Sequence, residues 1–546
     1  MNRTMNRNEQ DEPKQCHSTR KECLFTREDV ESKIAQGAHI FILNNKVINA
    51  NSFIKFHPGG HLPIKHMVGR DATDEVTALH SPEALKKMNA FQIGYIEGQW
   101  LNFTPPIQGG QFCTARTSQV SKSQEVKNPV EKEQDSAVRV KLDIAKSSKG
   151  NDSKDRPVWL DTRTQEELRI DESIYPSPDP ATQHFVIEKY RELYQQIKDE
   201  GLFDCHYTHY LYEVLRYASL GVASWIALRA GYYCISAFCL GFMWHLLVFS
   251  AHDAGHMGIT HNFQVDSAIG IIIADWIGGL SLGWWKRSHN VHHIVTNSTV
   301  HDPDIQHIPF FAVSHKFFDS LRSTYYERVM NFDRLAQFLI SKQNYLYYPI
   351  LCFGRFNLYR LSWEYLLCGQ APKRGVAAWH RWFEIAGQIF FWFWFGYGVL
   401  YMSIPDWKNR LLFILISHVV TSPLHVQITI SHFGMSTTDF GTHESFAQRM
   451  LRTTMDIDCP TWLDFYHGGL QYQAVHHMFP RLPRHNLRRA STLVQQWCKE
   501  VNIPYVMFTF TSGNKHVISH MADVAKMAKL LDACRKSVAN DMLNGH

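Results

Sequence analysis

Histidines are the residues of this chain whose number and spacing most directly indicate chemistry. The sequence has 546 residues and 31 histidines, of which eight lie between His252 and His307. Three clusters have a helical spacing: in two of them imidazoles stand three or four residues apart, and in the third a glutamine stands three and four residues before two histidines, which brings such side chains to one face of a helix. The clusters are His252-Asp253-Ala254-Gly255-His256, His289-Asn290-Val291-His292-His293 and Gln473-Ala474-Val475-His476-His477. Because imidazole nitrogens bind iron, copper, zinc and nickel, the clusters predict a metal site.

The number of imidazoles favours two metal ions. The clusters supply seven candidate ligands, which are His252, His256, His289, His292, His293, His476 and His477. His432, at the end of an apolar run, is an eighth candidate, with His425 as a less favoured substitute. Gln473 occupies the place of a leading histidine in the third cluster. A single zinc ion needs only three or four protein ligands, so seven or eight fit a pair of ions, and iron is favoured for oxidation with dioxygen.

His57 and His80 indicate a second metal chemistry. His57 stands directly before Pro58-Gly59-Gly60, and His80 follows 23 residues later, after the stretch GRDAT. Two imidazoles on opposite walls of a small apolar pocket can hold a haem iron on both faces. Such an iron has no open position, so the haem would carry electrons and would not itself activate dioxygen.

The two predicted sites complement each other. Breaking an unactivated C–H bond with dioxygen consumes two external electrons, and a haem delivers them one at a time. A haem domain tethered through a flexible linker reaches an effective concentration of about millimolar at the second site. The sequence therefore predicts one oxidative machine made of the haem pair and the histidine clusters.

Long uncharged runs position the clusters. Ala230–Ala251, Ile385–Pro405 and Leu411–Ser431 contain no Asp, Glu, Lys or Arg, and Tyr217–Leu228 is a shorter apolar stretch. At 1.5 Å per residue the three longer runs each span about 30 Å, the thickness of the hydrocarbon core of a bilayer. We expect about four transmembrane helices in two hairpins. Ser267–Trp285 carries Asp275 in its middle, which favours an interfacial or re-entrant segment.

Composition divides the chain into three parts. Residues 21–100 alternate short apolar runs with turn residues, as a small α+β domain does; residues 101–160 are polar and predict a flexible linker; residues 161–546 predict an all-α membrane domain. Met1–Arg20 has no apolar core, so we expect no cleaved signal and a cytosolic N-terminus. The polar segments between and after the hairpins would then share the cytosolic side.

Charge and cysteine usage exclude other classes. The net charge of +5 is too balanced to indicate nucleic-acid binding. The 11 cysteines include no C-x-x-C pair, which favours reduced thiols over a disulfide scaffold or a zinc ribbon.

The motifs resemble two known families. The joint pattern of H-P-G-G, G-R-D-A-T and a second histidine resembles cytochrome b5, which implies haem b held by His57 and His80. The three clusters, in this order and with these spans between them, resemble the membrane-bound desaturase/hydroxylase superfamily, and the fused haem domain together with Gln473 narrows the resemblance to front-end desaturases. That resemblance implies two non-haem irons held by the cluster histidines, less certainly by His432, and dioxygen as co-substrate.

Three stretches closely resemble fungal Δ8-sphingolipid desaturases: HDAGHMGITHNF, SLGWWKRSHNVHHIVTN with HDPDIQHIP, and CPTWLDFYHGGLQYQAVHHMFPRLPRHNLR. The resemblance implies a trans double bond at C8–C9 of the long-chain base of ceramide. It also implies a multi-pass protein of the endoplasmic reticulum membrane, with haem domain and clusters facing the cytosol, membrane lipids around it and NADH–cytochrome b5 reductase as electron source.

Several alternatives remain open at this point. A front-end fatty-acyl desaturase or a lipid hydroxylase would use the same ligands. An intramembrane zinc hydrolase is suggested by the likeness of His252-Asp253-Ala254-Gly255-His256 to H-E-x-x-H, and a non-catalytic haem receptor would leave the clusters idle. His301, Asp302 and Asp304 either orient metal-bound imidazoles or cap a loop.

Overall fold

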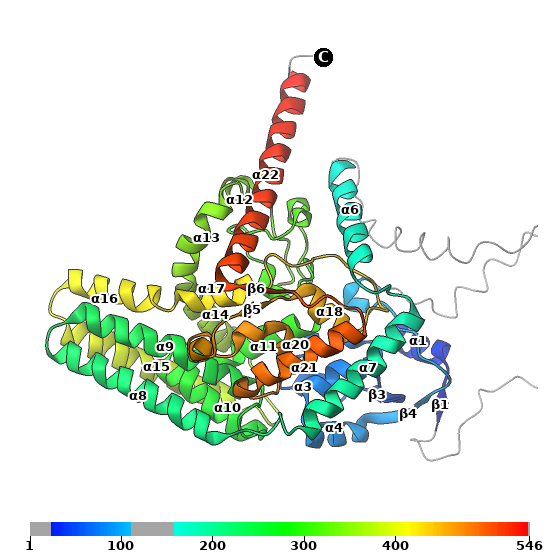
Figure 1. The fold of residues 1–546 in the computed structure, drawn as a ribbon, viewed down its shortest axis with the longest axis horizontal. Coiled ribbons are helices and arrows are strands. Elements are labelled where there is room, and N and C mark those ends of the chain that lie inside the picture. Colours follow the sequence, from blue (N-terminus) through cyan, green and yellow to red (C-terminus); the bar gives the residue numbers. More distant parts are fainter. Residues whose placement is uncertain (1–22, 111–157, 544–546) are drawn as a thin grey trace, which may run out of the picture.

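The computed structural model describes residues 23–110 and 158–543 (Figure 1). Met1–Arg20 and most of the predicted linker, 101–160, lie outside these ranges, so the linker boundaries stay a prediction. Residues 101–110 are described and pack on the first domain. The Phe103 ring lies so close to Gly69 that a Cβ there would be 2.8 Å from it, and the Phe103 N–H donates to the Gly69 carbonyl at 2.9 Å.

The first domain is built on a four-stranded sheet. Its strands are β1 (Leu24–Phe25), β2 (Ile40–Leu43), β3 (Lys46–Asn49) and β4 (Gln92–Ile96), in the order β1-β4-β3-β2. The β2–β3 hairpin turns through Asn44 and Asn45, both at positive φ, as a two-residue hairpin turn requires. Every side chain of β2 is buried, so the sheet forms one wall of the domain core.

Short helices of the first domain carry the two haem-candidate histidines. The helices are α1 (Arg27–Ala35), α2 (Leu62–Met67), α3 (Thr73–Leu79) and α4 (Pro82–Met88). His57 lies in the turn before α2, where Gly60 has a φ of +85°, and His80 directly follows α3. The expected α+β architecture of this domain is confirmed.

Three helices of the second domain are long and apolar enough to cross a bilayer. They are α9 (Tyr233–Gly255), the pair α15 (His380–Phe391) and η8 (Trp392–Ser403), and the pair α16 (Trp407–Val419) and α17 (Ser422–Ile430). α8 (Tyr207–Arg229) lies antiparallel against α9, and α16 packs on the other side of α9 (Figure 1). The three long apolar runs of the sequence thus correspond to membrane-spanning candidates.

The Ser267–Trp285 run is a broken segment. Helix α10 (Phe263–Ile271) continues as a π-helix to Ile277, and α11 (Leu282–Ile294) then departs at 118°. Asp275 is buried at the bend, where Oδ2 accepts from the Leu282 N–H at 3.2 Å and Oδ1 accepts from Gln388 Nε2 at 2.9 Å. If this bent pair counts as one span, the described residues hold up to four spans. The number agrees with the expected four, but the fourth candidate is this bent segment, whereas the expected fourth span, Tyr217–Leu228 in α8, does not pass as a spanning helix.

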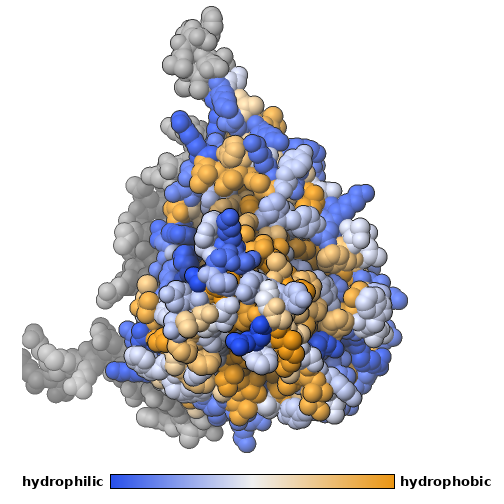
Figure 2. All heavy atoms as spheres, turned by 90° about the vertical axis from the view of Figure 1, so that its left-hand side faces the viewer, coloured by the Kyte–Doolittle hydropathy of each residue, from blue (hydrophilic) through white to orange (hydrophobic). Residues whose placement is uncertain are grey.

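Apolar side chains cover the outside of this helical bundle. Trp225, Phe238, Ile389, Phe393 and Leu411 are all exposed on α8, α9, α15, η8 and α16. Figure 2 looks onto the end of these helices and shows apolar side chains over much of that face, with polar ones between them. An outward apolar surface on a bundle of this length is what a bilayer covers.

The remaining elements lie beside and above the helical bundle in the view of Figure 1, where α6 and the outer part of α22 project from the body. They are α6 (Val158–Ile174), α7 (Pro180–Asp199), α12 (Arg334–Ile340), α13 (Gln343–Cys352), α14 (Gly354–Leu367), α18 (Phe446–Thr453), α19 (Asp464–His467), α20 (Gln473–Met478), α21 (Leu487–Glu500), α22 (Phe510–Leu543) and the parallel pair β5 (Asp456–Asp458) and β6 (Met507–Thr509). One apolar core joins α7, α18, α20 and α21, and it fixes the short helix that carries His476 and His477.

Candidate functional site

The structure gathers the predicted cluster histidines into two adjacent groups. Within each group the candidate ligand atoms all lie within 4.8 Å of one another. The first group is His252, His256, His289 and His476, and the second is His292, His432 and His477. For an ion such as zinc the metal–imidazole distance is roughly 2.0–2.1 Å, so atoms at this separation need only small movements to share one ion.

His293 lies between the two groups. Its ring centroid is 4.6 Å from that of His289 in the first group and 4.3 Å from that of His477 in the second. Its Nε2 is 3.1 Å from His289 Nε2, while its Nδ1 is buried without a hydrogen-bond partner in the part of the chain that the structure describes. One side chain therefore contacts both groups.

Four separate segments supply these imidazoles. α9 ends at His252 and His256, α11 carries the second cluster, α20 carries the third, and His432 follows the last residue of α17 by two positions. His425 is not part of the groups, because its ring lies against Gly354 on α14. His432 is thus the eighth histidine of the site, and its ring centroid lies 4.6 Å from that of His292.

The donor set fits metal ions. Nε2 of His252, His256, His476 and His477 is buried and has no hydrogen-bond partner among the described residues. Burying a polar atom without a hydrogen-bond partner costs free energy. Several such nitrogens that converge on one place therefore indicate a site for an electron-pair acceptor such as a metal ion. Two neighbouring nitrogen-rich groups suit a pair of transition-metal ions.

Carboxylates fix the imidazoles of the second cluster from behind. Asp302, fully buried, lies with Oδ2 2.8 Å from His292 Nδ1 and accepts the Asn297 N–H at 2.7 Å. Asp304 Oδ2 lies 3.6 Å from His289 Nδ1. Both carboxylates therefore stand where an outer partner sets the orientation of a ligand imidazole. His301 does not, because it bonds to Thr324 at 3.0 Å and packs on His66.

A buried ion-pair network stands behind the first cluster, and sequence reasoning missed it. Asp253 Oδ1 is 3.7 Å from His252 Nδ1, and its Oδ2 accepts from Tyr210 at 2.5 Å and from Arg484 Nη1 at 3.1 Å. Although burial opposes it, the Asp253 carboxylate raises the pKa of the Arg484 guanidinium. The only sequence signal was an acidic residue beside His252; its partner lies 231 positions away.

Trp285 seals the first group on one side. Its ring lies 4.5 Å from that of His289 and 5.3 Å from that of His252. A Cβ at Gly255 would come within 2.2 Å of the Trp285 ring, so this position needs glycine for steric reasons. The glycine in the first cluster thus admits the tryptophan that precedes the second.

Asp456 holds the helix of the third cluster. Its Oδ1 accepts the Ala474 N–H at 2.7 Å, and its Oδ2 accepts a hydrogen bond from Tyr505. Burial raises the pKa of Asp456 to about 7, and the two hydrogen bonds oppose the rise. Gln473 is buried at the first position of the same helix, one turn before His476 and His477.

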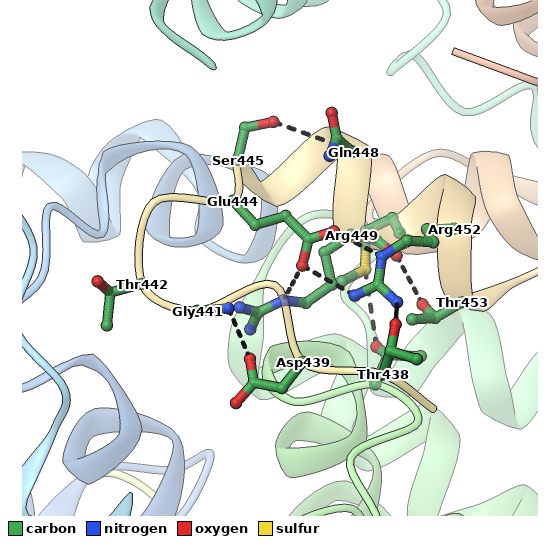
Figure 3. A network of polar contacts seen from close by, with 12 residues as sticks. Thr438, Asp439, Gly441, Thr442, Glu444, Ser445, Gln448, Arg449, Arg452 and Thr453 are labelled. Atoms are coloured by element: carbon green, nitrogen blue, oxygen red, sulfur yellow. Dashed lines mark hydrogen bonds and ion pairs between the residues drawn. The ribbon is translucent and has the colours of Figure 1, made fainter. Parts of the chain in front are cut away.

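Figure 3 shows a polar network between the loop that precedes α18 and the helix α18 itself. Arg452, near the end of α18, is buried and donates two hydrogen bonds to Glu444, of 2.7 and 2.9 Å. These bonds join the end of the loop to the helix. The Thr442 carbonyl of this loop accepts from Asn102 at 2.9 Å, and the Thr453 carbonyl lies 3.3 Å from His432 Nδ1. The loop therefore contacts the first domain, and the last residue of α18 contacts His432.

His57 and His80 face each other in the first domain. Their ring centroids are 5.9 Å apart. The Nδ1 of His57 lies 2.7 Å from the Gly60 carbonyl and that of His80 lies 2.9 Å from the Val76 carbonyl, so Nε2 is left on each ring for another bond. Burial lowers the pKa of His80 to about 4, which favours the neutral imidazole that binds metal. The pair suits the two axial positions of a haem iron.

Comparison with protein families matches both halves of the chain. Residues 26–97 match "Cytochrome b5-like Heme/Steroid binding domain", and residues 225–509 match "Fatty acid desaturase". The second match covers every cluster histidine and His432.

Curated relatives extend over nearly the whole chain. The chain is 58% identical to "Delta 8-(E)-sphingolipid desaturase" of Emericella nidulans, over 95% of this chain and 97% of the relative. It is 47% identical to the protein of that name from Kluyveromyces lactis, over 95% of each chain. It is 30% identical to "Delta(8)-fatty-acid desaturase 1" of Arabidopsis thaliana, over 96% of this chain and 98% of the relative.

Proposed function

Because this chain belongs to the membrane fatty acid desaturase family and carries a cytochrome b5-like domain ahead of its catalytic domain, we propose that it introduces a trans double bond between C8 and C9 of the long-chain base of ceramide. The names of the fungal relatives support the sphingolipid substrate, the position and the geometry. The family expected from the motifs is thereby confirmed, and the chain is an oxidoreductase of lipid metabolism.

The meeting of seven buried or nearly buried histidines in two adjacent groups, with His293 between them, carries the proposal. His252, His256, His289 and His476 would hold one iron, and His292, His432 and His477 would hold the other. His293 is positioned to serve either ion. Gln473, buried one turn away, is proposed as a further polar group of the site.

The reaction balances with electrons from the haem domain. The group –CH2–CH2– together with O2, two electrons and two protons gives –CH=CH– and two molecules of water. When bound, the two irons supply the reduction of dioxygen that makes removal of the two hydrogens favourable. A one-electron carrier must act twice for each double bond.

The chain's own residues prepare the site for this chemistry. Asp302 and Asp253 fix the orientation of His292 and His252, and Trp285 shields the first group. Burial keeps most of the imidazoles from water, which prevents electrons from being lost to solvent-derived side reactions.

The finer assignments follow from the same premise. We assign haem b to His57 and His80, and NADH–cytochrome b5 reductase as the source of its electrons. The membrane is proposed to be that of the endoplasmic reticulum, with the haem domain and both histidine groups on the cytosolic side. The position of all eight cluster histidines at one end of the candidate spans supports a single-sided site.

A second candidate is a fatty-acyl desaturase. The Arabidopsis thaliana relative is named for a fatty acid at 30% identity, whereas the fungal relatives named for a sphingolipid reach 58%. A lipid hydroxylase shares the C–H abstraction and diverges only afterwards. The difference in identity favours the sphingolipid substrate.

Mass analysis of the products tests the substrate. The chain is expressed in a strain that lacks the activity, ceramides are supplied, and the long-chain base and fatty acid are weighed separately. A base lighter by two hydrogens is expected. A base heavier by one oxygen would indicate a hydroxylase, and an unsaturated fatty acid on an unchanged base would indicate the acyl enzyme.

Metal analysis of the purified full chain tests the chemistry. Two non-haem irons and one haem per chain are expected. One zinc without non-haem iron would support an intramembrane hydrolase, and haem alone would support a haem receptor. Either result would overturn the desaturase mechanism.

A further inference from the structure

Helix α11 contacts both the histidine groups and the first domain. One face presents His289, His292 and His293 to the histidine groups. Val291 and Ile294, on another face, are buried in one apolar cluster with core residues of the first domain. The cytochrome b5-like domain is therefore docked on the helix that carries the second histidine cluster.

Polar contacts on other elements hold the same docking. Arg191 on α7 forms an ion pair with Asp74 on α3, with Nε 2.8 Å from Oδ1. Asn102 donates to the Thr442 carbonyl at 2.9 Å. Because these contacts add to the shared apolar cluster, the first domain presents one defined face to the catalytic domain.

The turn that carries His57 lies on this face. The Gly59 carbonyl is 3.5 Å from Asn290 Nδ2, an amide nitrogen that donates toward it. A Cβ at Gly59 would come within 2.9 Å of Asn290 Nδ2 and 3.0 Å of His57 Cε1. The absence of a side chain at Gly59 therefore lets α11 approach the backbone next to the His57 imidazole.

Asn290 joins the two sites by a short path. It directly follows His289, whose imidazole belongs to the first histidine group. On its other side it meets Gly59, two positions after His57. A path along the chain from the His57 imidazole to the His289 imidazole thus crosses a single non-covalent contact.

A contact at His80 offers a longer route. Arg481 Nη1 donates to the His80 carbonyl at 3.0 Å. Arg481 comes four residues after His477, and the far end of its side chain makes the contact. Each additional bond or gap in a path slows electron transfer, so the path through Asn290 is the more direct of the two.

We propose that Asn290 is the contact through which electrons pass from the haem domain to the histidine groups. This rests on the proposed haem at His57 and His80 and on the proposed irons of the desaturase site. One electron passes at a time: the haem changes from Fe(II) to Fe(III), and the iron pair gains the electron. Two passages supply the two electrons that one double bond consumes, and the reductase returns the haem to Fe(II) after each.

Rapid mixing of the full chain in detergent tests the proposal. The chain is reduced at both sites, bound to ceramide and mixed with dioxygen. The first double bond takes its two electrons from the iron pair, so its yield should be the same in Asn290→Leu. The haem oxidation that follows should be slowed severalfold, and steady turnover with it. Haem content, haem spectrum and non-haem iron should match those of the unchanged chain.

Arg287→Met is the matched control on the same helix. Its Cγ would be 3.7 Å from a Cβ at Gly60, and its guanidinium donates to Gln370 Oε1 at 2.6 Å. Methionine keeps the Cγ, so haem oxidation should keep its rate.

The outcomes separate the possible failures. Haem oxidation at an unchanged rate in Asn290→Leu would overturn the proposal, as would slow oxidation in Arg481→Met alone. A first double bond that does not form in the unchanged chain would instead overturn the proposed function.

Cysteine pairing tests the contact without haem or iron. Gly59→Cys and Asn290→Cys are combined in the full chain, the membranes are oxidised, and the linked peptides are identified by mass. A Cβ at Gly59 lies 2.9 Å from Asn290 Nδ2, which sets the two Cβ atoms near the roughly 3.5–4.5 Å that a disulfide bridges. Each single variant is a control, because the chain has other free cysteines. A double variant that keeps its melting temperature but forms no link would overturn the docking on which the proposal depends.

Discussion

The two histidine sites of this chain are held in opposite ways. In the first domain, His57 and His80 are fixed by carbonyls three and four residues away, at Gly60 and Val76. In the catalytic domain the imidazoles come from four segments, and their outer partners lie far along the chain in several cases. Arg484 supports His252 through Asp253 across 231 positions.

The difference teaches how each site depends on the fold. The hydrogen bonds that fix this pair all lie within its small domain, so its local geometry should depend less on the rest of the fold. A site assembled from four segments exists only when the membrane helices and the polar elements are packed together. Changes at the two sites should therefore leave opposite signatures in haem content and non-haem iron.

The sharpest separation is expected from His293→Ala. Because His293 contacts both groups, its loss should remove non-haem iron and lower turnover by more than the roughly 10–100-fold that loss of an outer partner costs. The haem absorption spectrum should not change. His425→Ala, outside the groups, is the control and should keep its iron. Retained turnover in His293→Ala would contradict the assigned role.

The reverse signature is expected from His57→Ala. Haem should be lost because one of the two imidazoles proposed to hold it is gone, while non-haem iron stays at the level of the unchanged chain. Desaturation supported by reductase should fall below detection, since the one-electron carrier is missing. Haem spectra and metal analysis measure both quantities. His39→Ala, an imidazole of the same domain bonded to Asn51, should bind haem normally.

An intermediate effect is expected from Asp302→Asn. The amide keeps the shape of the carboxylate but not its charge, so His292 loses the negative charge 2.8 Å from its Nδ1. Turnover or iron affinity should fall about 10–100-fold. Asp304→Asn should cost less, because its carboxylate lies 3.6 Å from His289. Equal effects of the two changes would mean that distance to the imidazole does not decide the loss.

Gly255→Ala tests the packing of the first group. The added methyl would meet the Trp285 ring at 2.2 Å, and overpacking of this kind costs about 1–3 kcal/mol. A lower melting temperature and reduced iron are expected, and Trp285→Phe in the same chain should restore part of both. Gly221→Ala on α8, whose Cβ would meet only Met243 at 3.4 Å, is the control. An unchanged melting temperature in Gly255→Ala would refute the steric argument.

The smallest effect is expected from Ile294→Val, on the face of α11 that packs against the core of the first domain. Loss of one buried methylene costs about 0.5–1.5 kcal/mol. The change should make the first domain more susceptible to proteolytic release without altering the spectrum of bound haem. Ile272→Val, at a position 45% exposed, should have no effect on release. Equal release from both variants would argue against the shared core.

The sequence predicted what depends on local spacing and missed what depends on distant packing. The turn at His57, the apolar runs and the helical spacing of the clusters each lie within a few tens of residues, so composition and periodicity reveal them. Asp253 and Arg484, 231 positions apart, meet only in the folded chain. That His432 and not His425 belongs to the histidine groups could likewise be known only from the path of the chain after α17.

The shared core of α11 limits how this protein can be recombined. A chimera that exchanged only the haem module with a relative would set a foreign surface against Val291 and Ile294, which pack in the core of that module. Transplanting the module together with the outer residues of this 13-residue helix would preserve the joint and leave the inward imidazoles untouched. The boundary best suited to module exchange therefore runs along α11, between its outer and its inward side chains, rather than through the polar segment that joins the domains.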